Sequence, residues 1–288
     1  MSAPKLLAPS YMMQIHRFTN PQLFHDRCGE WLLQSELKNS TMLAVVKILI
    51  EGDHPFEPPF YLATIETETG IVGCAVRAPP DSLLLADVPV DAVPLLATDI
   101  ATVYDSLPSV TGMQIDASTF SKRWQRQRGE HMTTIHWSWY ALDKVIAPKN
   151  PAPGQLRLAD ASDLDLIREW APRFARETNT LFNVIAFYER RVRTGSLYLW
   201  IDDEPRSMVA VSAMTQNSIR ISGVYTSRDY RRIGYASTAV ASVSQLMLDA
   251  GHKFCGLFAD KADLYANGMY QAIGFEPVFD NVNIRLLE

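Results

Sequence analysis

Three features are scarce in this chain of 288 residues, and each absence excludes a class of protein. It has three cysteines, Cys28, Cys74 and Cys255, too widely spaced for a metal site and odd in number for a disulfide framework. It has no apolar run approaching the ~20 residues of a membrane helix. Its formal net charge is −5, whereas general nucleic-acid or membrane-surface binders carry a basic patch. We therefore expect no nucleic acid, no membrane and no metal among its partners.

The first residues, MSAPKLLAPSYMMQ, do not resemble a signal peptide, because their apolar core is two leucines between prolines. Together with the unpaired cysteines, this indicates a reducing, cytoplasmic setting.

The chain is long enough for two domains at ~150 residues each. The stretch APKNPAPG, residues 147–154, reads as a linker because it holds three prolines and a glycine. The expected division is a first domain at 1–147, a linker at 148–154 and a second domain at 155–288.

The second half predicts the element order βααβββαβαβ. The helix at 235–250 has a clear apolar face and stops before Gly251. Strands that alternate with helices favour an α/β, or α+β layered, domain. The expected strands are 155–160, 196–202, 207–214, 218–226, 253–260 and 276–287, and the other helices are 162–178, 183–193 and 263–273.

The first half repeats this order with little residue identity, which favours two copies of one fold over two unrelated α/β domains. The halves differ at one loop. The second half has SRDYRRIGYA, residues 227–236, where the first has PVDAVPLLA, without Arg or Gly. If both halves are copies, only the second keeps the charged loop.

The strand before this loop predicts a β-bulge. Ile219 and Ile221 share one face by the two-residue period, and Val224 breaks that phase by one. An extra residue at Ser222–Gly223 explains the shift and leaves backbone groups unpaired for a ligand.

The helix after the loop predicts an anion site. Its first turn has up to four free N–H groups and roughly half a positive charge from the helix dipole. Gly234 and Ala236 allow close approach, and Arg231 and Arg232 add cations, so a pyrophosphate fits. The alternative is a solvated basic turn, with Arg228 as its third cation, that caps a surface helix.

This combination resembles the GNAT superfamily of acyl-CoA-dependent acyltransferases, whose phosphate loop reads Arg/Gln-x-x-Gly-x-Gly/Ala. Arg231, Gly234 and Ala236 match it, and the element order matches from about Gln155 to Glu288. The resemblance implies two tandem GNAT-like domains, each a mixed central sheet flanked by helices, with acetyl-CoA as cosubstrate. It also implies a coenzyme site of Val224, Tyr225, Thr226, Arg231, Arg232, Ile233, Gly234, Tyr235, Ala236, Ser237, Asp263 and Asn267.

A branch of that superfamily ends with Asn-Pro-x-Ser-Asn-x-x-Tyr-x-x-x-Gly-Phe/Tyr. Asn267, Tyr270, Gly274 and Phe275 match in DLYANGMYQAIGF, residues 263–275, whereas Asp263 replaces the first Asn, Leu264 the Pro and Ala266 the Ser. By resemblance, Tyr270 protonates the leaving thiolate, which a modest fall in its pKa would ease. The alternative is a tyrosine that packs on Phe275 with its hydroxyl in water.

The general base for an attacking amine is not visible in the sequence. The candidates are Glu177, Asp202, Asp203, Tyr225 and a water relay. Backbone N–H groups at the bulge are expected to stabilise the oxyanion.

Other polar clusters have simpler interpretations. His131 and His136 lie on opposite faces of a strand, so they are ordinary strand residues rather than metal ligands. Arg123, Arg126 and Arg128 surround one helical turn as a solvated face rather than a nucleic-acid contact.

The sequence therefore predicts an acetyl-CoA-dependent N-acetyltransferase that transfers its acetyl group directly to a small-molecule or peptide amine, as a monomer or homodimer. The first domain is expected to shape the acceptor pocket. The alternatives are a non-catalytic acyl-CoA sensor or regulatory module and a structural protein that pairs with a partner.

Overall fold

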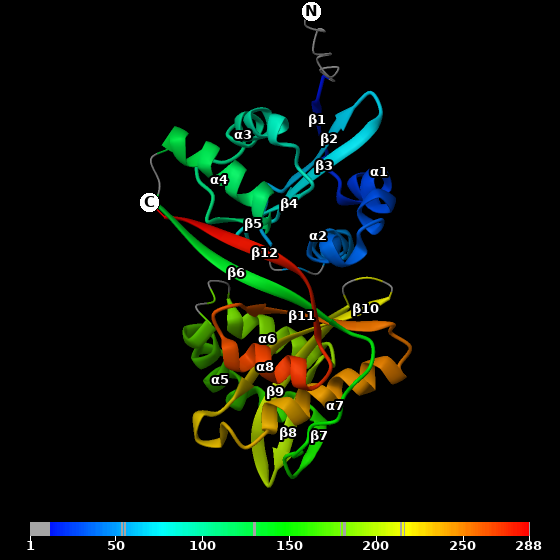
Figure 1. The fold of residues 1–288 in the computed structure, drawn as a ribbon. Coiled ribbons are helices and arrows are strands. Elements are labelled where there is room, and N and C mark those ends of the chain that lie inside the picture. Colours follow the sequence, from blue (N-terminus) through cyan, green and yellow to red (C-terminus); the bar gives the residue numbers. More distant parts are fainter. Residues whose placement is uncertain are drawn as a thin grey trace, which may run out of the picture. The chain divides into compact units, whose positions relative to one another are not determined.

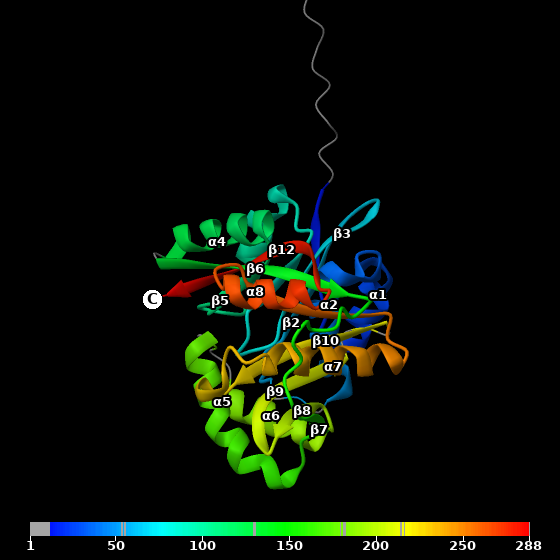
Figure 2. The same cartoon turned by 60° about the horizontal axis from the view of Figure 1, so that its bottom comes forward.

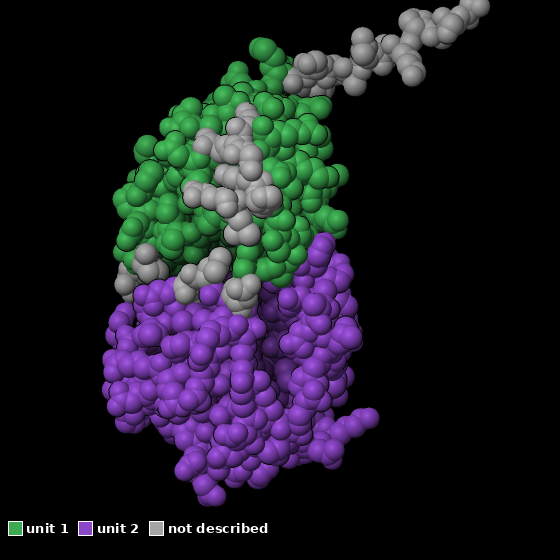
Figure 3. Space-filling model, turned by 90° about the vertical axis from the view of Figure 1, so that its left-hand side faces the viewer, with its two compact units in different colours: residues 1–135, 281–288 green, residues 136–280 purple. Residues whose placement is uncertain are grey.

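The computed structural model describes residues 12–287 except 53, 55, 129, 130, 179, 181, 182, 214 and 216. The side chains of Arg128 and His131, which the sequence analysis weighed, lie outside the described residues. The chain forms two compact units, residues 1–135 with 281–288 and residues 136–280 (Figure 3). Within the described part, no helix is both long and apolar enough to cross a membrane.

Unit 1 has its helices on both faces of one sheet. Alternation along β2 explains the two layers: Leu62 faces the core beside α1 and α2, whereas Tyr61 and Ala63 face the core beside α3 and α4. Its elements are β1 (Gln14–Arg17), α1 (Pro21–Leu33), α2 (Glu36–Glu51), β2 (Tyr61–Thr67), β3 (Gly70–Arg77), β4 (Leu83–Ala86), α3 (Val93–Ile100), β5 (Ser109–Met113) and α4 (Gln114–Arg128).

Unit 2 follows the same plan (Figures 1 and 2). Its core beside α5 and α6 contains Leu197 and Leu199, and its core beside α7 contains Ile219 and Ile221. Its elements are β7 (Gln155–Leu158), α5 (Leu164–Thr178), α6 (Val184–Arg193), β8 (Leu197–Asp202), β9 (Glu204–Ala213), β10 (Ser218–Thr226), α7 (Tyr235–Asp249), β11 (Phe254–Asp260) and α8 (Leu264–Ala272).

Two strands, β6 (His131–Leu142) and β12 (Glu276–Leu287), end the two halves of the chain. Residues 137–142 of β6 pair with β11 in unit 2, and residues 281–285 of β12 pair with β5 in unit 1. Each half of the chain therefore supplies the last strand of the other half's sheet.

Strand order is equivalent in two sets of neighbouring strands, β1-β2-β3-β4-β5-β12 and β7-β8-β9-β10-β11-β6. In each, one neighbouring pair is parallel, β4 with β5 and β10 with β11, and the others are antiparallel. Both halves of the chain read βααβββαβαβ. The predicted repeat of element order is therefore confirmed, as is the class of mixed sheets flanked by helices. The division at 148–154 stays a prediction about which parts fold independently.

Candidate functional site

Strand β10 is interrupted by a β-bulge between Ser222 and Tyr225, as the sequence predicts. Gly223 lies in the bulge with a left-handed φ of 56°. A Cβ at Gly223 would lie 2.4 Å from the Tyr188 hydroxyl oxygen. That hydroxyl instead donates a hydrogen bond of 3.1 Å to the Gly223 carbonyl oxygen. The left-handed φ and the nearness of the Tyr188 ring to the Cβ position therefore both require glycine at position 223.

The parallel pairing of β10 with β11 is short. It joins Ser218–Arg220 to Phe254–Gly256, whereas β10 continues to Thr226 and β11 to Asp260. Over that length β10 stays paired with β9, and β11 with β6. Beyond Arg220 and Gly256 the two strands thus form a fork, in which backbone groups of β10 are available to a ligand.

The loop that follows β10 leads into α7 through two left-handed residues. Arg232 has a φ of 68° and Gly234 a φ of 105°. Gly234 is the N-cap of α7, and no side chain caps the helix. A Cβ at Gly234 would lie 3.2 Å from the Asn150 carbonyl oxygen, so a side chain there is both strained and crowded. The first-turn amides of α7 are left for solvent or a ligand.

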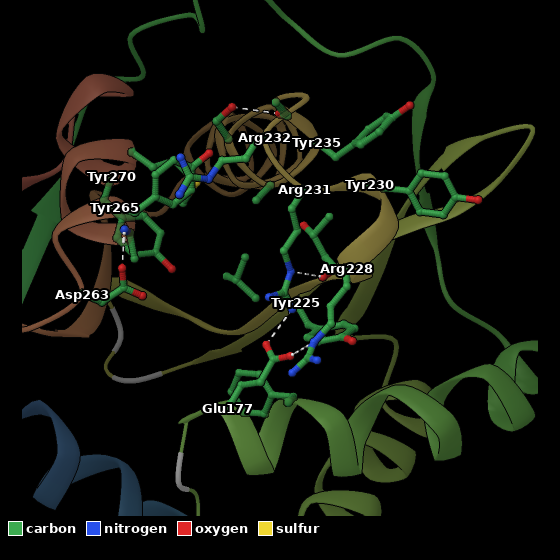
Figure 4. Close-up of a pocket in the computed structure, with 18 of the residues that line it drawn as sticks. Glu177, Tyr225, Arg228, Tyr230, Arg231, Arg232, Tyr235, Asp263, Tyr265 and Tyr270 are labelled. Atoms are coloured by element: carbon green, nitrogen blue, oxygen red, sulfur yellow. Dashed lines mark hydrogen bonds and ion pairs between the residues drawn. The ribbon is translucent and has the colours of Figure 1, made fainter.

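A cavity of about 590 Å³ opens where the fork, the loop and α8 meet (Figure 4). Ile233 and Asn267 of the predicted coenzyme site are not among its lining residues, and the side chain of Ile233 is exposed. The predicted residues that line the cavity are Val224, Tyr225, Thr226, Arg231, Arg232, Gly234, Tyr235, Ala236, Ser237, Asp263 and Tyr270.

Two loop arginines share one carboxylate. Arg228 Nε donates to Glu177 Oε1 at 2.9 Å, and Arg231 donates through an Nη atom to Glu177 Oε2 at 2.6 Å. Arg231 Nε also donates to the Thr226 carbonyl oxygen at 2.9 Å. In Figure 4 both arginines point toward Glu177 on α5, across the cavity from α8. Glu177 thus ties the end of α5 to the loop.

The other two cations near the loop lie over aromatic rings. The guanidinium carbon of Arg232 is 4.2 Å from the centre of the Tyr265 ring, and that of Arg206 is 4.0 Å from the Tyr230 ring. Arg232 and Tyr265 both line the cavity, so this contact holds a positive charge beside the first turn of α7.

Tyr270 lies on α8 with 9% of its surface exposed. Its ring packs edge-on against Phe275 at 5.9 Å, the contact expected in the alternative interpretation. The residue nevertheless lines the cavity. Burial, together with the negative charge of Asp263, raises the pKa of Tyr270, which is the opposite of the fall that would ease proton transfer. The phenol therefore stays protonated at neutral pH and can donate a hydrogen bond into the cavity.

Two residues near Tyr270, Asp263 and Asn267, form hydrogen bonds with other residues of unit 2. Asp263 caps α8 by accepting a hydrogen bond of 2.9 Å from the Ala266 amide, so an acceptor suits this position. Asn267 is buried, accepts from the Tyr140 hydroxyl at 2.7 Å and donates to the Asp260 and Asp263 carbonyl oxygens. Its role as a coenzyme contact stays a prediction, and the structure supplies a packing role beside it.

The candidate bases differ in their surroundings. Burial alone would raise the pKa of Glu177, but the hydrogen bonds and charges of Arg231 and Arg228 hold it below its usual value, which makes Glu177 a weak base. Asp202 accepts a short hydrogen bond from the Tyr235 hydroxyl, and Asp203 is exposed. The Tyr225 hydroxyl is buried and has no hydrogen-bond partner among the described residues.

Sequence reasoning missed several residues of the site. Tyr265 and Tyr230 are in segments that the sequence analysis quoted, yet no spacing rule links either to a cation. Phe174 and Met269 line the cavity and have only the pattern of ordinary helix residues. Glu177, one of the candidate bases, forms two ion pairs that link α5 to the loop.

Comparison with known proteins finds one family profile that matches part of the second half. Residues 162–275 match the sequence profile of the acetyltransferase (GNAT) family. No curated protein matches the chain. The matched residues include the bulged strand, the loop, α7 and Tyr270.

Solved structures resemble the chain over nearly its whole length. A protein described as from Drosophila malonogaster covers 95% of this chain and 98% of its own, with a TM-score of 0.69 and 12% identity. A GCN5-related N-acetyltransferase from Sphaerobacter thermophilus covers 95% of each chain, with a TM-score of 0.60 and 12% identity. A tandem GNAT protein from the clavulanic acid biosynthesis pathway covers 96% of this chain and 98% of its own, with a TM-score of 0.54 and 14% identity. At these identities the likeness shows the fold, which is that of tandem GNAT proteins.

Proposed function

Because residues 162–275 form a domain of the acetyltransferase (GNAT) family, we propose that the chain is an N-acetyltransferase that moves an acetyl group from acetyl-CoA directly to the amine of a small molecule or peptide. One observation carries this proposal. The uncapped first turn of α7, the bulged end of β10 and Tyr270 all line a single cavity. An anion site, an extended backbone edge and a proton donor are the parts that this reaction needs.

The residues present fit the donor molecule. Amides of Arg232 through Ala236 would bind its pyrophosphate, since the left-handed Gly234 leaves them without a side-chain cap. Backbone groups of Val224 and Thr226 would bind the pantetheine arm and acyl carbonyl, because β10 has no strand partner on its fork side there. The cavity volume of about 590 Å³ is within the usual range for small-molecule sites.

The reaction makes one bond and breaks one. The neutral amine would attack the thioester carbonyl carbon, so a C–N bond forms, and the C–S bond breaks as the tetrahedral intermediate collapses. Tyr270, which burial keeps protonated, would supply a proton or hydrogen bond to the leaving sulfur. The amine's proton would pass to water in the cavity, because Glu177 is held ionised by two arginines and Asp202 is bonded to Tyr235.

One observation favours the alternative of an acyl-CoA sensor without turnover. The carboxylates of Glu177 and Asp202, two of the candidate bases, already accept hydrogen bonds from protein side chains. A sensor would bind acetyl-CoA and release no thiol with any amine, whereas an enzyme would release one thiol for each amide formed.

Calorimetry with acetyl-CoA, followed by thiol release across an amine panel, tests the proposal. Ligand at about 100 times its Kd should stabilise the protein by ~2.7 kcal/mol. Gly234→Trp should abolish the binding heat because the indole fills the space in which the ligand approaches the loop backbone. Arg232→Glu should abolish it because the positive charge beside the pyrophosphate becomes negative. Lys253→Glu, an exposed charge reversal that does not line the cavity, is the matched control. Absence of binding heat in the unaltered protein would refute the coenzyme site.

A further inference from the structure

Two consecutive arginines of the loop before α7 extend in different directions. In Figure 4 Arg231 points toward Glu177 on α5, whereas Arg232 points toward Tyr265 on α8. The distances agree with this view. An Nη atom of Arg231 lies 2.6 Å from Glu177 Oε2, and the guanidinium carbon of Arg232 lies 4.2 Å from the centre of the Tyr265 ring. The two cations therefore have different partners, although both line one cavity.

The side chain of Arg231 bridges the end of β10 and the end of α5. Its Nε donates to the Thr226 carbonyl oxygen at 2.9 Å, while its Nη donates to Glu177. Thr226 is the last residue of β10 and is paired with Ser207 of β9. Glu177 lies in the last turn of α5. One guanidinium group thus connects a paired strand end to a helix end, and we call this contact the Arg231 bridge.

Both ends of the Arg231 bridge are anchored by packing. The Ser207 hydroxyl donates to the Tyr225 carbonyl oxygen at 3.0 Å, next to Thr226. The Tyr225 ring lies 5.5 Å from the Trp170 ring of α5, and both residues are 3% exposed in the core beside α5 and α6. Because α5 and β10 are packed together, the Glu177 carboxylate has a fixed place from which it orients Arg231.

The Arg231 bridge adjoins the strained part of the loop. Arg231 itself is extended, with a φ of −75° and a ψ of 156°. Arg232 follows with a φ of 68°, a left-handed conformation that is unfavourable for a residue with a Cβ. Such a conformation persists where the surrounding structure holds it. The two hydrogen bonds of the Arg231 side chain hold the chain directly before this turn, and the turn aims the first amides of α7.

Arg228 shares the Glu177 carboxylate but is a weaker partner. Its Nε donates to Glu177 Oε1 at 2.9 Å, and its side chain is 76% exposed, whereas that of Arg231 is 38% exposed. Water screens an exposed pair more strongly, so the pair with Arg231 contributes more to holding the loop.

We propose that Glu177 and Arg231 are positioning residues for the pyrophosphate of acetyl-CoA. The Glu177 carboxylate holds Arg231 against Thr226, and this bridge sets the turn at Arg232 that directs the α7 amides and the Arg232 guanidinium to the pyrophosphate. The inference rests on the proposed coenzyme site. It gives Arg231, the first residue of the Arg-x-x-Gly-x-Ala motif, a role that acts through the loop, and makes Arg232 the side chain that contacts the anion.

Glu177→Ala tests the proposal by the sign of its effect. Loss of a carboxylate near an anion site should, by charge alone, strengthen anion binding. Loss of the bridge should instead raise the Kd of acetyl-CoA by about fivefold or more in calorimetry on the full chain. Glu177→Gln keeps one acceptor oxygen and should raise it less. An unchanged or lower Kd in Glu177→Ala overturns the proposal.

The matched control is Glu169→Ala on the same helix. Glu169 is exposed, pairs with Arg173 at 2.9 Å and does not line the cavity, so its loss should leave the Kd unchanged. Melting temperatures within a few degrees of the unaltered protein show that the variants fold. A rise in Kd for Glu169→Ala equal to that for Glu177→Ala contradicts a specific role of Glu177.

A double-mutant cycle separates positioning from direct contact. Arg231→Gln should raise the Kd of acetyl-CoA in the unaltered protein, and by a smaller factor in the Glu177→Ala background, because part of the bridge is already lost there. If Arg231 touches the pyrophosphate directly, its loss has the same factor in both backgrounds, and that result overturns the proposal.

A donor without pyrophosphate shows whether the effect is local. S-acetylpantetheine has the thioester and the pantetheine arm of acetyl-CoA but lacks its pyrophosphate. In thiol-release assays, Glu177→Ala should lower kcat/KM more for acetyl-CoA than for S-acetylpantetheine, mainly through KM. Equal losses with the two donors would indicate a general loosening of the site and contradict the assignment to the pyrophosphate.

Binding separates this inference from the proposed acetyl transfer. If acetyl-CoA binds but no amine releases thiol, transfer fails, and the Kd values still decide the inference. If amines are acetylated while Glu177→Ala binds acetyl-CoA normally, the inference alone fails. Inorganic pyrophosphate, followed by phosphorus NMR, tests the anion site without the coenzyme. Binding that is lost in Glu177→Ala supports the bridge, and equal binding, or none in either protein, refutes it.

Discussion

The Tyr188 hydroxyl on α6 donates its hydrogen bond to the Gly223 carbonyl oxygen, 3.1 Å away in the bulge of β10. A helix on one face of the sheet thus holds the irregular segment of the strand that borders the cavity. Tyr188 is 0% exposed, and burial raises its pKa, so the hydroxyl stays a donor. The bulge is fixed by packing as well as by its glycine.

Gly223→Ala should destabilise the protein by about 1–3 kcal/mol, because a non-glycine residue at a left-handed φ is strained and its Cβ meets the Tyr188 hydroxyl. Denaturant unfolding measures this change. Gly251→Ala is the matched control, since Gly251 has a φ of 99° and nothing within 4 Å of its Cβ position. Equal losses in the two variants would show that the Tyr188 contact adds nothing.

Glu177→Gln should weaken the acid dependence of stability. The folded carboxylate has a lowered pKa, since the two arginines outweigh its burial, so its contribution is present above the unfolded-state value of ~4.3 and is lost as pH falls through the folded value. The unaltered protein should lose more stability than the variant between about pH 5 and pH 3. At neutral pH the variant should be less stable by no more than about 1 kcal/mol, because Arg228 is largely exposed.

The control for this change is Glu169→Gln, on the same helix, where the exposed pair with Arg173 spans one turn. Thermal unfolding across the pH range compares the three proteins. An acid profile of Glu177→Gln that matches the unaltered protein would contradict the assigned ion pairs.

Asp263→Asn should lower the pKa of Tyr270. The amide keeps an oxygen that can accept the Ala266 hydrogen bond and cap α8, but it removes the charge that raises the phenol's pKa. Burial remains, so the value should stay above that of a free tyrosine. Absorbance-detected titration is measured for Asp263→Asn and for the double variant that also carries Tyr270→Phe. The difference between the two curves gives the titration of the Tyr270 phenol. Asp260, at the end of β11, accepts a hydrogen bond from the Ala262 amide. Asp260→Asn removes its negative charge and should leave the titration of Tyr270 unchanged.

Tyr270→Phe should reduce kcat by about 10²–10⁴, the usual contribution of general acid catalysis, while acetyl-CoA still binds. Rapid-quench measurement of amide product gives kcat, and calorimetry gives the affinity. Full activity without the hydroxyl would leave Tyr270 with only its packing against Phe275.

A fragment of residues 136–280 should fold, whereas one of residues 148–280 should be less stable by more than about 3 kcal/mol. The shorter fragment lacks the part of β6 that pairs with β11, and with it the buried Tyr140 and Leu142 of the unit 2 core. Circular dichroism melting distinguishes them. Identical melting curves would favour the linker at 148–154 as the true boundary.

Local patterns predicted most of the second half. The alternation along β10 that breaks at Val224 gave the bulge, and the Arg-x-x-Gly-x-Ala motif located the start of α7. These features depend on neighbours in sequence, and so a single sequence contains them. The cap of α8 comes from the structure: Asp263, which the resemblance places in the coenzyme site, accepts the hydrogen bond that caps this helix.

Contacts between distant residues could not be predicted in this way. Nothing near Glu177 in sequence indicates Arg228 and Arg231, more than fifty positions later. The repeat of element order implies a strand before the first helix, and the structure shows it as β1, whose four residues pair with β2.

The pairing of residues 281–285 with β5 has a consequence for synthesis on the ribosome. The unit 1 sheet cannot close when its own strands emerge, since the partner of β5 is residues 281–285, which are translated much later than β5. β6, by contrast, is made early and is ready when β11 appears. Nascent chains stalled before residue 281 should therefore expose β5 as an open edge, a place for chaperones to bind or for two unfinished chains to join.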